Sequence, residues 1–364
     1  MSDPNYGDTQ TGPRAEAEAK PVERVLSGLI LGERLSWTGM FERSRLLPAW
    51  TRRKRREIEA QGDAEGILET ILPFSLNVSP APFYPGPGAH TEWFIFQLQL
   101  AVQTDGSAER ALENWQRLAQ NTADLRLTLA QQAALTHLRA GRTPPVTGHD
   151  NPHYFDDGAC FRALAMACWE LYAPRPRLET TLLERVTRDA EITNAEDGVW
   201  GARAVAAFVG AADQPLAERL QCALDEFPPG SWSSRVAETA LAQVGVSKTV
   251  FDLSRRLSKL ANYAYSYGNA AAETVPAALA ILAYSEGDHE KALLAALGVP
   301  RQAGSLVPLV GALCGALPGA PVHPGTLESP LFGVALPFLA GRSAKEHLAA
   351  LGKHERNSSY GPNA

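Results

Sequence analysis

A polar loop that leads into a helix of small residues is the first feature of this sequence that could support chemistry. The stretch from Pro300 to Gly319 reads PRQAGSLVPLVGALCGALPG. Ser305 is a candidate N-cap, and Pro308 follows in the predicted first turn, where a missing N–H is tolerated. Free N–H groups at a helix start can bind an anion or a metal-bound ligand. Gly311 and Gly315 lie four residues apart and predict the close approach of a second helix.

Composition places the chain among globular proteins and excludes several other classes. Its 364 residues are 45% hydrophobic and 20% charged, which is enough for a sizeable core. The net charge of −6 argues against a general nucleic-acid binder, which would need a basic face. We interpret the single basic run, Arg52–Arg56, as a solvated surface. No apolar run approaches the roughly 18 residues that span a bilayer, so no membrane contact is predicted.

The cysteines and the two ends of the chain predict a cytoplasmic protein. The first residues are polar and lack the apolar segment of a signal peptide. We expect residues 1–22 and 353–364 to be disordered tails around one domain at 23–352. Four cysteines without CxxC spacing are expected to be reduced, buried thiols rather than a zinc site: Cys160, Cys168, Cys222 and Cys314.

Helical periodicity extends over most of residues 23–352, and alternating strand patterns are nearly absent. One stripe, for example, contains Val250, Leu253 and Leu257, with Arg and Lys on the opposite face. Helices are predicted at 111–120, 127–140, 159–172, 178–190, 201–211, 214–226, 232–243, 250–264, 275–285, 288–297, 305–317 and 343–352. The segments 79–90 and 141–158 are predicted loops. Together these patterns predict a single compact all-α, multi-helix domain.

Four segments share a pattern of glycine, alanine and acidic residues with one known family. They are GLILGERLSWTGMFE (28–42), DDGACFRALAMACWELY (156–172), YGNAAAETVPAALAILAYSEGDHEKALLAALG (267–298) and GALCGALPG (311–319). In this order the chain resembles the ADP-ribosylglycohydrolase family. The resemblance implies an all-α fold, the removal of ADP-ribose from proteins or related acceptors, and two magnesium ions in a central cleft.

The residues that the resemblance assigns to the metal centre have largely changed. The family's Thr-Asp-Asp-Thr motif corresponds to Thr91-Glu92-Trp93-Phe94, and its Asp-x-Asp-Thr/Ser motif to Gln302-Ala303-Gly304-Ser305. Magnesium requires hard oxygen ligands, and only Glu92 retains a carboxylate at these positions. We therefore expect no metal ion and no cofactor.

The resemblance also suggests two carboxylates for acid–base catalysis. Cleavage of a ribosyl bond passes through an oxocarbenium-like state and needs a carboxyl group to activate water or protonate the leaving group. Glu92 is the first candidate, and Glu33, at the family's aspartate position in the amino-terminal helix, is the second. The glutamate that often acts in the family corresponds to Met40. Glu42, two positions further on, is interpreted as a surface carboxylate.

The residues that the resemblance assigns to ligand binding are better preserved than those of the metal centre. Asp157-Gly158-Ala159 corresponds to an Asn-Gly-Ala segment whose small residues let the backbone approach a nucleotide. Thr193-Asn194 replaces a Thr-His turn, and Asn can still bond a ribose hydroxyl. With Ser305, these residues are predicted to bind ADP-ribose or a related nucleotide. Arg162 either anchors this loop or forms a structural ion pair. Six aromatic residues either stack on adenine or pack in the core: His153, Tyr154, Phe155, Tyr263, Tyr265 and Tyr267.

Two main functional hypotheses follow, from different classes. The first is a non-catalytic relative that keeps the fold and an ADP-ribose or nucleotide cleft. The second is a hydrolase of a ribosyl glycosidic bond that works without two metals. An ordinary metal-dependent hydrolase and a helical interaction protein without a ligand are further alternatives. The sequence identifies no protein partner.

Trp93 provides a structural test of the first hypothesis. It stands at a metal-ligand position of the family, while Ala303 and Gly304 remove side-chain volume from the other motif. We predict that the indole fills the former metal cleft and packs against residues 300–305. Trp93→Asp is then expected to cost roughly 2–4 kcal/mol without creating activity.

Overall fold

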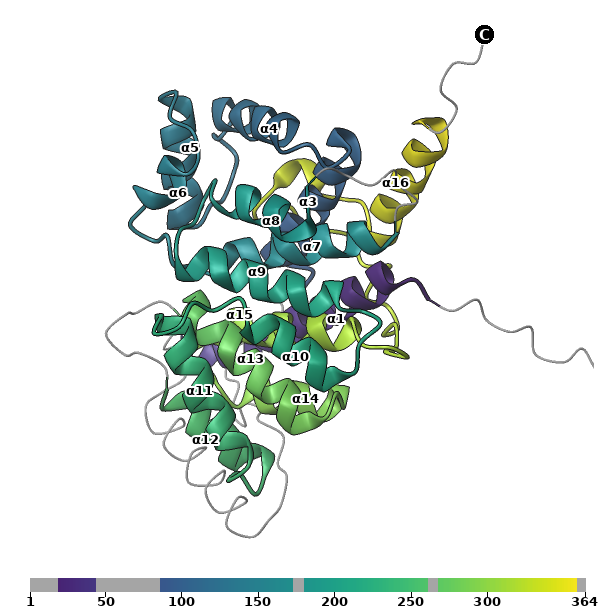
Figure 1. Cartoon of the computed structure of the whole chain (residues 1–364). Helices are drawn as coiled ribbons and strands as arrows, with labels where there is room; N and C mark the ends of the chain where they lie inside the picture. The colour runs from purple at the N-terminus through teal and green to yellow at the C-terminus, as the bar shows by residue number, and fades with distance from the viewer. Residues whose placement is uncertain (1–18, 44–85, 173–179, 261–267, 359–364) are drawn as a thin grey trace, which may run out of the picture.

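The protein is built from α-helices, and the described residues contain no β-strand (Figure 1). The computed structural model describes residues 19–43, 86–172, 180–260 and 268–358. Its helices are α1 Pro21–Arg43, α3 Ala89–Thr104, α4 Ala108–Gln120, α5 Leu129–Arg139, α6 Val146–His149, α7 Gly158–Tyr172, α8 Leu182–Ala190, α9 Asp197–Gly210, α10 Leu216–Leu224, α11 Trp232–Val244, α12 Val250–Ser258, α13 Ala271–Ser285, α14 His289–Leu297, α15 Ala303–Gly315, the 3₁₀ helix η2 Pro337–Leu339 and α16 Ala344–Ser358. The predicted all-α, single compact domain is confirmed.

From α3 to α14 the arrangement of the helices follows their order along the chain (Figure 1). Helices α3–α8 form the upper part of the view and α10–α14 the lower part, with α9 between them. Helix α7 packs against α3, α8 and α9, and α13 packs against α9, α11 and α15. Both α7 and α13 are rich in buried alanine, so their neighbours approach closely and the helix starts lie near one another.

The closest helix pair, α1 and α15, meets through glycines on both sides. A Cβ atom at Gly28 would lie 2.1 Å from the Gly311 carbonyl oxygen, and one at Gly315 would lie 2.4 Å from the Arg24 carbonyl oxygen. No side chain fits in these gaps, so the two backbones are in direct contact. The predicted close approach at Gly311 and Gly315 is confirmed, and the partner is α1.

The predicted helices are present, with differences at several boundaries. Helix α3 was not predicted, and it begins at Ala89, inside the predicted loop 79–90. Its ten buried residues include polar ones such as Thr91, Glu92 and Gln97, so it lacks the amphipathic stripe that reveals a helix. The predicted loop 141–158 contains the short helix α6. Helix α16 continues to Ser358, past the predicted end of the domain at residue 352.

Several other sequence expectations can be placed on the structure. All four cysteines are free, and Cys160, Cys168 and Cys314 are buried. Within the described ranges, no helix combines the length and apolar character needed to cross a bilayer. The basic run and the three tyrosines at 263, 265 and 267 lie outside the described residues, as do the side chains of Met40 and Glu42.

Candidate functional site

The starts of several helices meet in the interior and are joined by hydrogen bonds. An isolated bridge pairs Asp156 with Ala270, so the segment before α7 lies against the segment before α13. The Ser305 hydroxyl in α15 donates to Asp157 Oδ1 over 3.2 Å. The His90 ring of α3 contacts the start of α15. Helices α13 and α15 begin without a side-chain cap, so the positive ends of their dipoles face this centre.

His90 completes the first turn of α15, and this contact determines which ring nitrogen carries the hydrogen. Pro308 has no N–H, so the Gly304 carbonyl four residues earlier lacks its helical donor. His90 Nε2 lies 3.1 Å from that oxygen, and because a carbonyl only accepts, Nε2 is the protonated nitrogen. The ring stacks on Phe161 at a centroid distance of 3.8 Å. Burial lowers the pKa of His90 to about 4, so the ring is neutral at pH 7.

Asp156 and Asp157 form an adjacent pair of buried carboxyl groups in front of α7. Burial raises the pKa of Asp156, and burial together with the neighbouring Asp156 carboxyl raises the pKa of Asp157 well above its usual range. Asp156 accepts hydrogen bonds from the Gly158 N–H at 3.1 Å and from Asn194 Nδ2 at 3.0 Å. Asp157 Oδ2, by contrast, has no hydrogen-bond partner among the described residues. Asp157 therefore keeps its proton to a higher pH than an ordinary aspartate.

Thr193 and Asn194, two of the predicted ligand-binding residues, belong to a chain of hydrogen bonds. Arg162 donates from Nε to Asp189 Oδ2 and from Nη2 to Thr193 Oγ1, each over 2.8 Å. Thr193 Oγ1 then donates to Asn194 Oδ1 over 2.6 Å, and Asn194 Nδ2 donates to Asp156. The ion-pair interpretation of Arg162 is correct, and the segment that its guanidinium group anchors directly is the Thr193-Asn194 turn rather than the loop at 157–159.

The six predicted ligand-binding residues lie in one region, and most are buried. Only Gly158 among them is partly exposed; the others are Asp157, Ala159, Thr193, Asn194 and Ser305. The N-cap role predicted for Ser305 was wrong, because α15 begins at Ala303 and Gln302 occupies the N-cap position. Ser305 lies within the first turn instead, which allows its hydroxyl to reach Asp157.

Glu33 in α1 caps the start of α3. Its carboxylate accepts the Gly88 N–H at 2.6 Å, the His90 N–H at 2.9 Å and the Thr91 hydroxyl at 2.6 Å. Burial raises the pKa of Glu33, and these hydrogen bonds oppose the rise. The carboxylate thus joins α1 to α3 and satisfies N–H groups that the helix itself leaves free.

Glu92 in α3 holds the segment that precedes η2. Its two oxygens accept the N–H groups of Val334, Ala335 and Leu336 at 2.6, 2.7 and 2.8 Å. The residue is fully buried, and burial raises its pKa while the three N–H donors oppose the rise. The acid–base roles of Glu92 and Glu33 stay predictions, but backbone donors surround both carboxylates.

A comparison of the sequence with models of known protein families identifies the family of this chain. A family model described as ADP-ribosylglycohydrolase matches residues 18–347. The chain belongs to the ADP-ribosylglycohydrolase family. The match extends from the start of α1 to α16, and so includes every helix start that meets at the centre. A search of curated proteins gives no match.

The residues at the positions of an ADP-ribosylglycohydrolase metal centre do not fit two magnesium ions. Thr91 donates its hydroxyl hydrogen to Glu33, and Glu92 faces backbone N–H groups. Gln302 Nε2 donates to Glu273 Oε2 over 2.9 Å. Among the residues that the structure describes, no three His, Cys, Asp or Glu side chains are grouped to hold a metal ion. The oxygens that magnesium would need are engaged in protein hydrogen bonds.

Trp93 is buried, but the location predicted for it was wrong. Its ring stacks on Trp115 of α4 at a centroid distance of 5.4 Å and an interplanar angle of 5°, and it meets Phe96 edge-on. The contact from α3 to residues 300–305 comes from His90 instead. Trp115 on α4 and Phe96 on α3 pack against the indole, and the imidazole of His90 lies beside Gly304.

Sequence reasoning missed His90 and Glu273, which are both part of this centre. Glu273 is 2% exposed and accepts the hydrogen bond from Gln302. Its signal was available, because it lies in the ETVP segment that carries the family resemblance. Pro308 also signalled that the Gly304 carbonyl lacks its helical donor, but nothing local identified His90 as the replacement.

Proposed function

We propose that this chain is a non-hydrolytic member of the ADP-ribosylglycohydrolase family that binds ADP-ribose or a related nucleotide. The observation that carries the proposal is Glu92. It stands at a position where the family resemblance expects a metal ligand, yet both of its oxygens accept backbone N–H groups from Val334–Leu336. Coordination of a cation would require these three buried donors to lose their acceptor.

The binding half of the proposal rests on the helix starts. Helices α13 and α15 begin without a side-chain cap, and the positive ends of their dipoles suit a phosphate, although the Ala271, Glu273 and Ser305 N–H groups already bond backbone carbonyls. Asp157 Oδ2 has no partner among the described residues and can hydrogen-bond a ribose hydroxyl, as donor when the carboxyl group is protonated and as acceptor when it is ionised. The Ser305 hydroxyl already bonds Asp157 and holds that carboxyl group in place.

Thermal unfolding with ADP-ribose, with and without magnesium, tests the proposal. Because a ligand that binds only the folded state stabilises it, ADP-ribose should raise Tm by an amount that grows with its concentration. Millimolar magnesium should leave that shift unchanged, and incubation with ADP-ribosylated protein should release no ADP-ribose. Magnesium-dependent release would overturn the proposal, and so would the absence of any Tm shift.

Two buried serines provide a matched pair of variants. Ser305→Ala removes the hydroxyl that bonds Asp157, and we expect it to weaken ADP-ribose binding by about fivefold, the effect of one hydrogen bond. Ser285→Ala removes a hydroxyl that bonds the Leu282 carbonyl at the far end of α13, and binding should be unchanged. Equal effects of the two variants would place the ligand elsewhere.

A hydrolase that works without metals is the second candidate, and Asp157 is the observation that favours it. This reaction needs a carboxyl group that protonates the leaving group. Burial raises the pKa of Asp157, and this carboxyl group has one oxygen without a partner, whereas Glu92 and Glu33 are surrounded by donors. On this hypothesis Asp157→Asn abolishes metal-free release of ADP-ribose. Glu92→Gln leaves the rate of release per folded molecule the same as in the unmodified protein. Absence of release by the unmodified protein excludes this candidate.

A further inference from the structure

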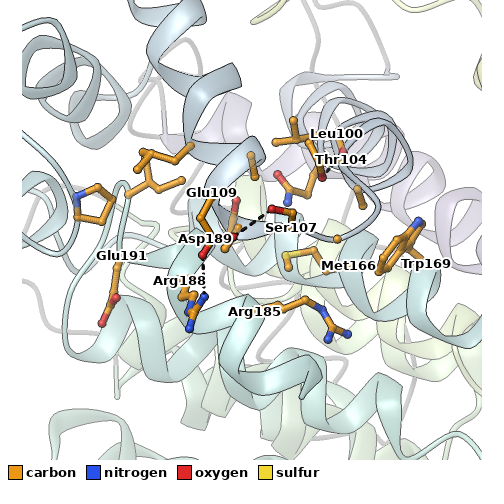
Figure 2. Close-up of a pocket in the computed structure, with 18 residues that line it drawn as sticks. Leu100, Thr104, Ser107, Glu109, Met166, Trp169, Arg185, Arg188, Asp189 and Glu191 are labelled. Carbon is orange, nitrogen blue, oxygen red and sulfur yellow. Dashed lines mark hydrogen bonds and ion pairs between the residues drawn. The ribbon is translucent and has the colours of Figure 1, made fainter. Parts of the chain in front are cut away.

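A separate cavity of about 280 Å³ lies between α3, α4, α7 and α8 (Figure 2). None of His90, Asp156, Asp157 or Ser305 lines it, so it is distinct from the helix-start centre. Much of its wall is apolar and includes Leu100, Leu112, Met166 and Ile192. An apolar pocket with a few placed polar groups is the usual form of a small-molecule site.

Two polar side chains in this wall each keep an oxygen without a donor. These are Gln97 Oε1 in α3 and Asp189 Oδ1 in α8, and the two residues are only 2% and 7% exposed. Arg162 holds the other Asp189 oxygen at 2.8 Å, which fixes the carboxylate in place. Buried acceptors without donors are costly, and a ligand that supplies N–H groups removes that cost.

The cationic side chains of the wall already have partners. Arg185 bonds the Glu170 carboxylate and the Thr180 carbonyl, and Arg188 pairs with Glu109 at 3.3 Å. The wall therefore offers unsatisfied acceptors, while both of its guanidinium groups are engaged. This balance favours a ligand with hydrogen-bond donors over an anion.

The Arg188–Glu109 pair lies on the solvent side of the cavity, where it joins α8 to α4 (Figure 2). The two side chains are 51% and 76% exposed, and Ser107 also donates to Glu109. Exposed ion pairs contribute little to stability. The pair can therefore separate and admit a ligand without disturbing the core.

We propose that this cavity is a second ligand site, for a small molecule with an apolar body and an N–H donor head group such as an amidine or a primary amine. The apolar body lies against Met166 and Leu112. The head group donates to Gln97 Oε1 and Asp189 Oδ1 once neighbouring side chains move aside, since both oxygens have almost no accessible surface. The site does not depend on the function proposed for the helix-start centre.

Calorimetric titration of the full chain with benzamidine, and with benzoate as its acceptor-only counterpart, tests this proposal. Benzamidine should bind with a Kd of about 1 mM or tighter, which is within reach for a ligand of its size. Benzoate should bind at least about tenfold more weakly, because it brings no donor to the two oxygens. Failure of benzamidine to bind, or equal binding of the two probes, would overturn the proposal.

Matched variants locate the benzamidine site. Ala108→Phe fills the cavity from the first turn of α4 and should abolish binding, whereas Ala140→Phe, on the exposed end of α5, should not. Gln97→Leu keeps a side chain of similar size and should weaken binding by about fivefold. Gln103→Leu, at an exposed position of the same helix, should match the unmodified protein. Binding that survives both Ala108→Phe and Gln97→Leu would place the probe elsewhere and refute the assignment.

Discussion

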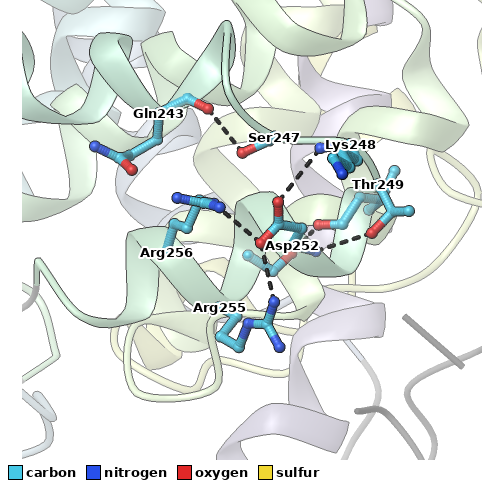
Figure 3. A network of polar contacts seen from close by, with 9 residues as sticks. Gln243, Ser247, Lys248, Thr249, Asp252, Arg255 and Arg256 are labelled. Atoms are coloured by element: carbon cyan, nitrogen blue, oxygen red, sulfur yellow. Dashed lines mark hydrogen bonds and ion pairs between the residues drawn. The ribbon is translucent and has the colours of Figure 1, made fainter. Parts of the chain in front are cut away.

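Asp252 and Asp157 stand at the starts of two helices in opposite surroundings. Asp252 in the first turn of α12 accepts from Arg256 at 2.9 Å, from Arg255 at 3.0 Å and from the Lys248 N–H at 3.3 Å (Figure 3). Burial opposes its ionisation, but the hydrogen bonds from the two arginines outweigh that effect and lower its pKa. Asp157, before α7, faces the hydroxyls of Ser305 and Thr274 and the carboxyl group of Asp156, and burial raises its pKa.

The difference separates carboxyl groups whose oxygens all have hydrogen-bond donors from one that keeps an oxygen without a donor. Asp252 has guanidinium partners, and Glu33 and Glu92 have backbone N–H donors. All three have donors for both of their oxygens. Asp157 alone in this set keeps an oxygen without a hydrogen-bond partner among the described residues. Each of the following substitutions changes the partners of a carboxyl group and so tests this distinction.

The largest effect is expected from adding a carboxylate that has no partner. Trp93→Asp removes an indole that stacks on Trp115 and buries a charge among aromatic rings. We expect a loss of about 4 kcal/mol of unfolding free energy, from the cavity and the unpaired charge together. Urea unfolding measures it. Normal stability with magnesium-dependent hydrolysis would show that a metal centre is merely masked in this chain.

Removal of a structural carboxylate should have the next largest effect. Glu92→Gln replaces one of the accepting oxygens with an NH₂ group that faces backbone donors of Val334–Leu336. A loss of about 3 kcal/mol is expected, because buried N–H groups are left without an acceptor. Thermal unfolding tests this, with Glu290→Gln on the exposed side of α14 as the neutral control. A fully stable Glu92→Gln variant would contradict the structural role.

For Asp157 the informative quantity is pH dependence. The folded protein keeps this proton to a higher pH than the unfolded chain, so its contribution to stability falls as pH rises from about 4 through the raised folded pKa. Asp157→Asn removes this pH-dependent loss of stability, because the amide does not titrate. The free energy of unfolding of the variant should therefore rise relative to that of the unmodified protein as pH increases from about 5 to about 8. The rise should be at most about 1.4 kcal/mol per pH unit. A difference that does not change with pH would mean that Asp157 is ionised in the fold.

The smallest effect is expected at Asp252, although it has the most ionic partners. The Arg255 and Arg256 side chains are 52% and 38% exposed, so solvent screens their attraction. Asp252→Asn should cost about 1 kcal/mol at neutral pH, and high salt should reduce this cost. Because the folded pKa is lowered, the loss should also diminish as the pH falls below about 4. Urea unfolding in low and high salt measures both trends. A salt-independent cost would show that the arginines do not act through charge.

Structural features that leave a pattern in neighbouring residues could be predicted from the sequence. Helix α12 shows an apolar stripe with arginines opposite it, and Gly311 and Gly315 stand four residues apart, as helix contact requires. Helix α3 escaped prediction because its polar residues, several of them buried, do not form a face separate from the apolar ones. Ser305 was assigned to the wrong helical position because the two small residues before it, Ala303 and Gly304, carry no cap signal.

The sequence by itself determined the family and the all-helical fold. The tertiary structure decided what the remaining polar groups do. Glu92 bonds a backbone N–H 242 residues away, and Ser305 bonds Asp157 148 residues away. His90 likewise supplies the donor that Pro308 cannot give to Gly304. Helical periodicity is a local property that a few turns of sequence reveal. The partner of a buried polar group depends instead on which distant segment the fold brings beside it.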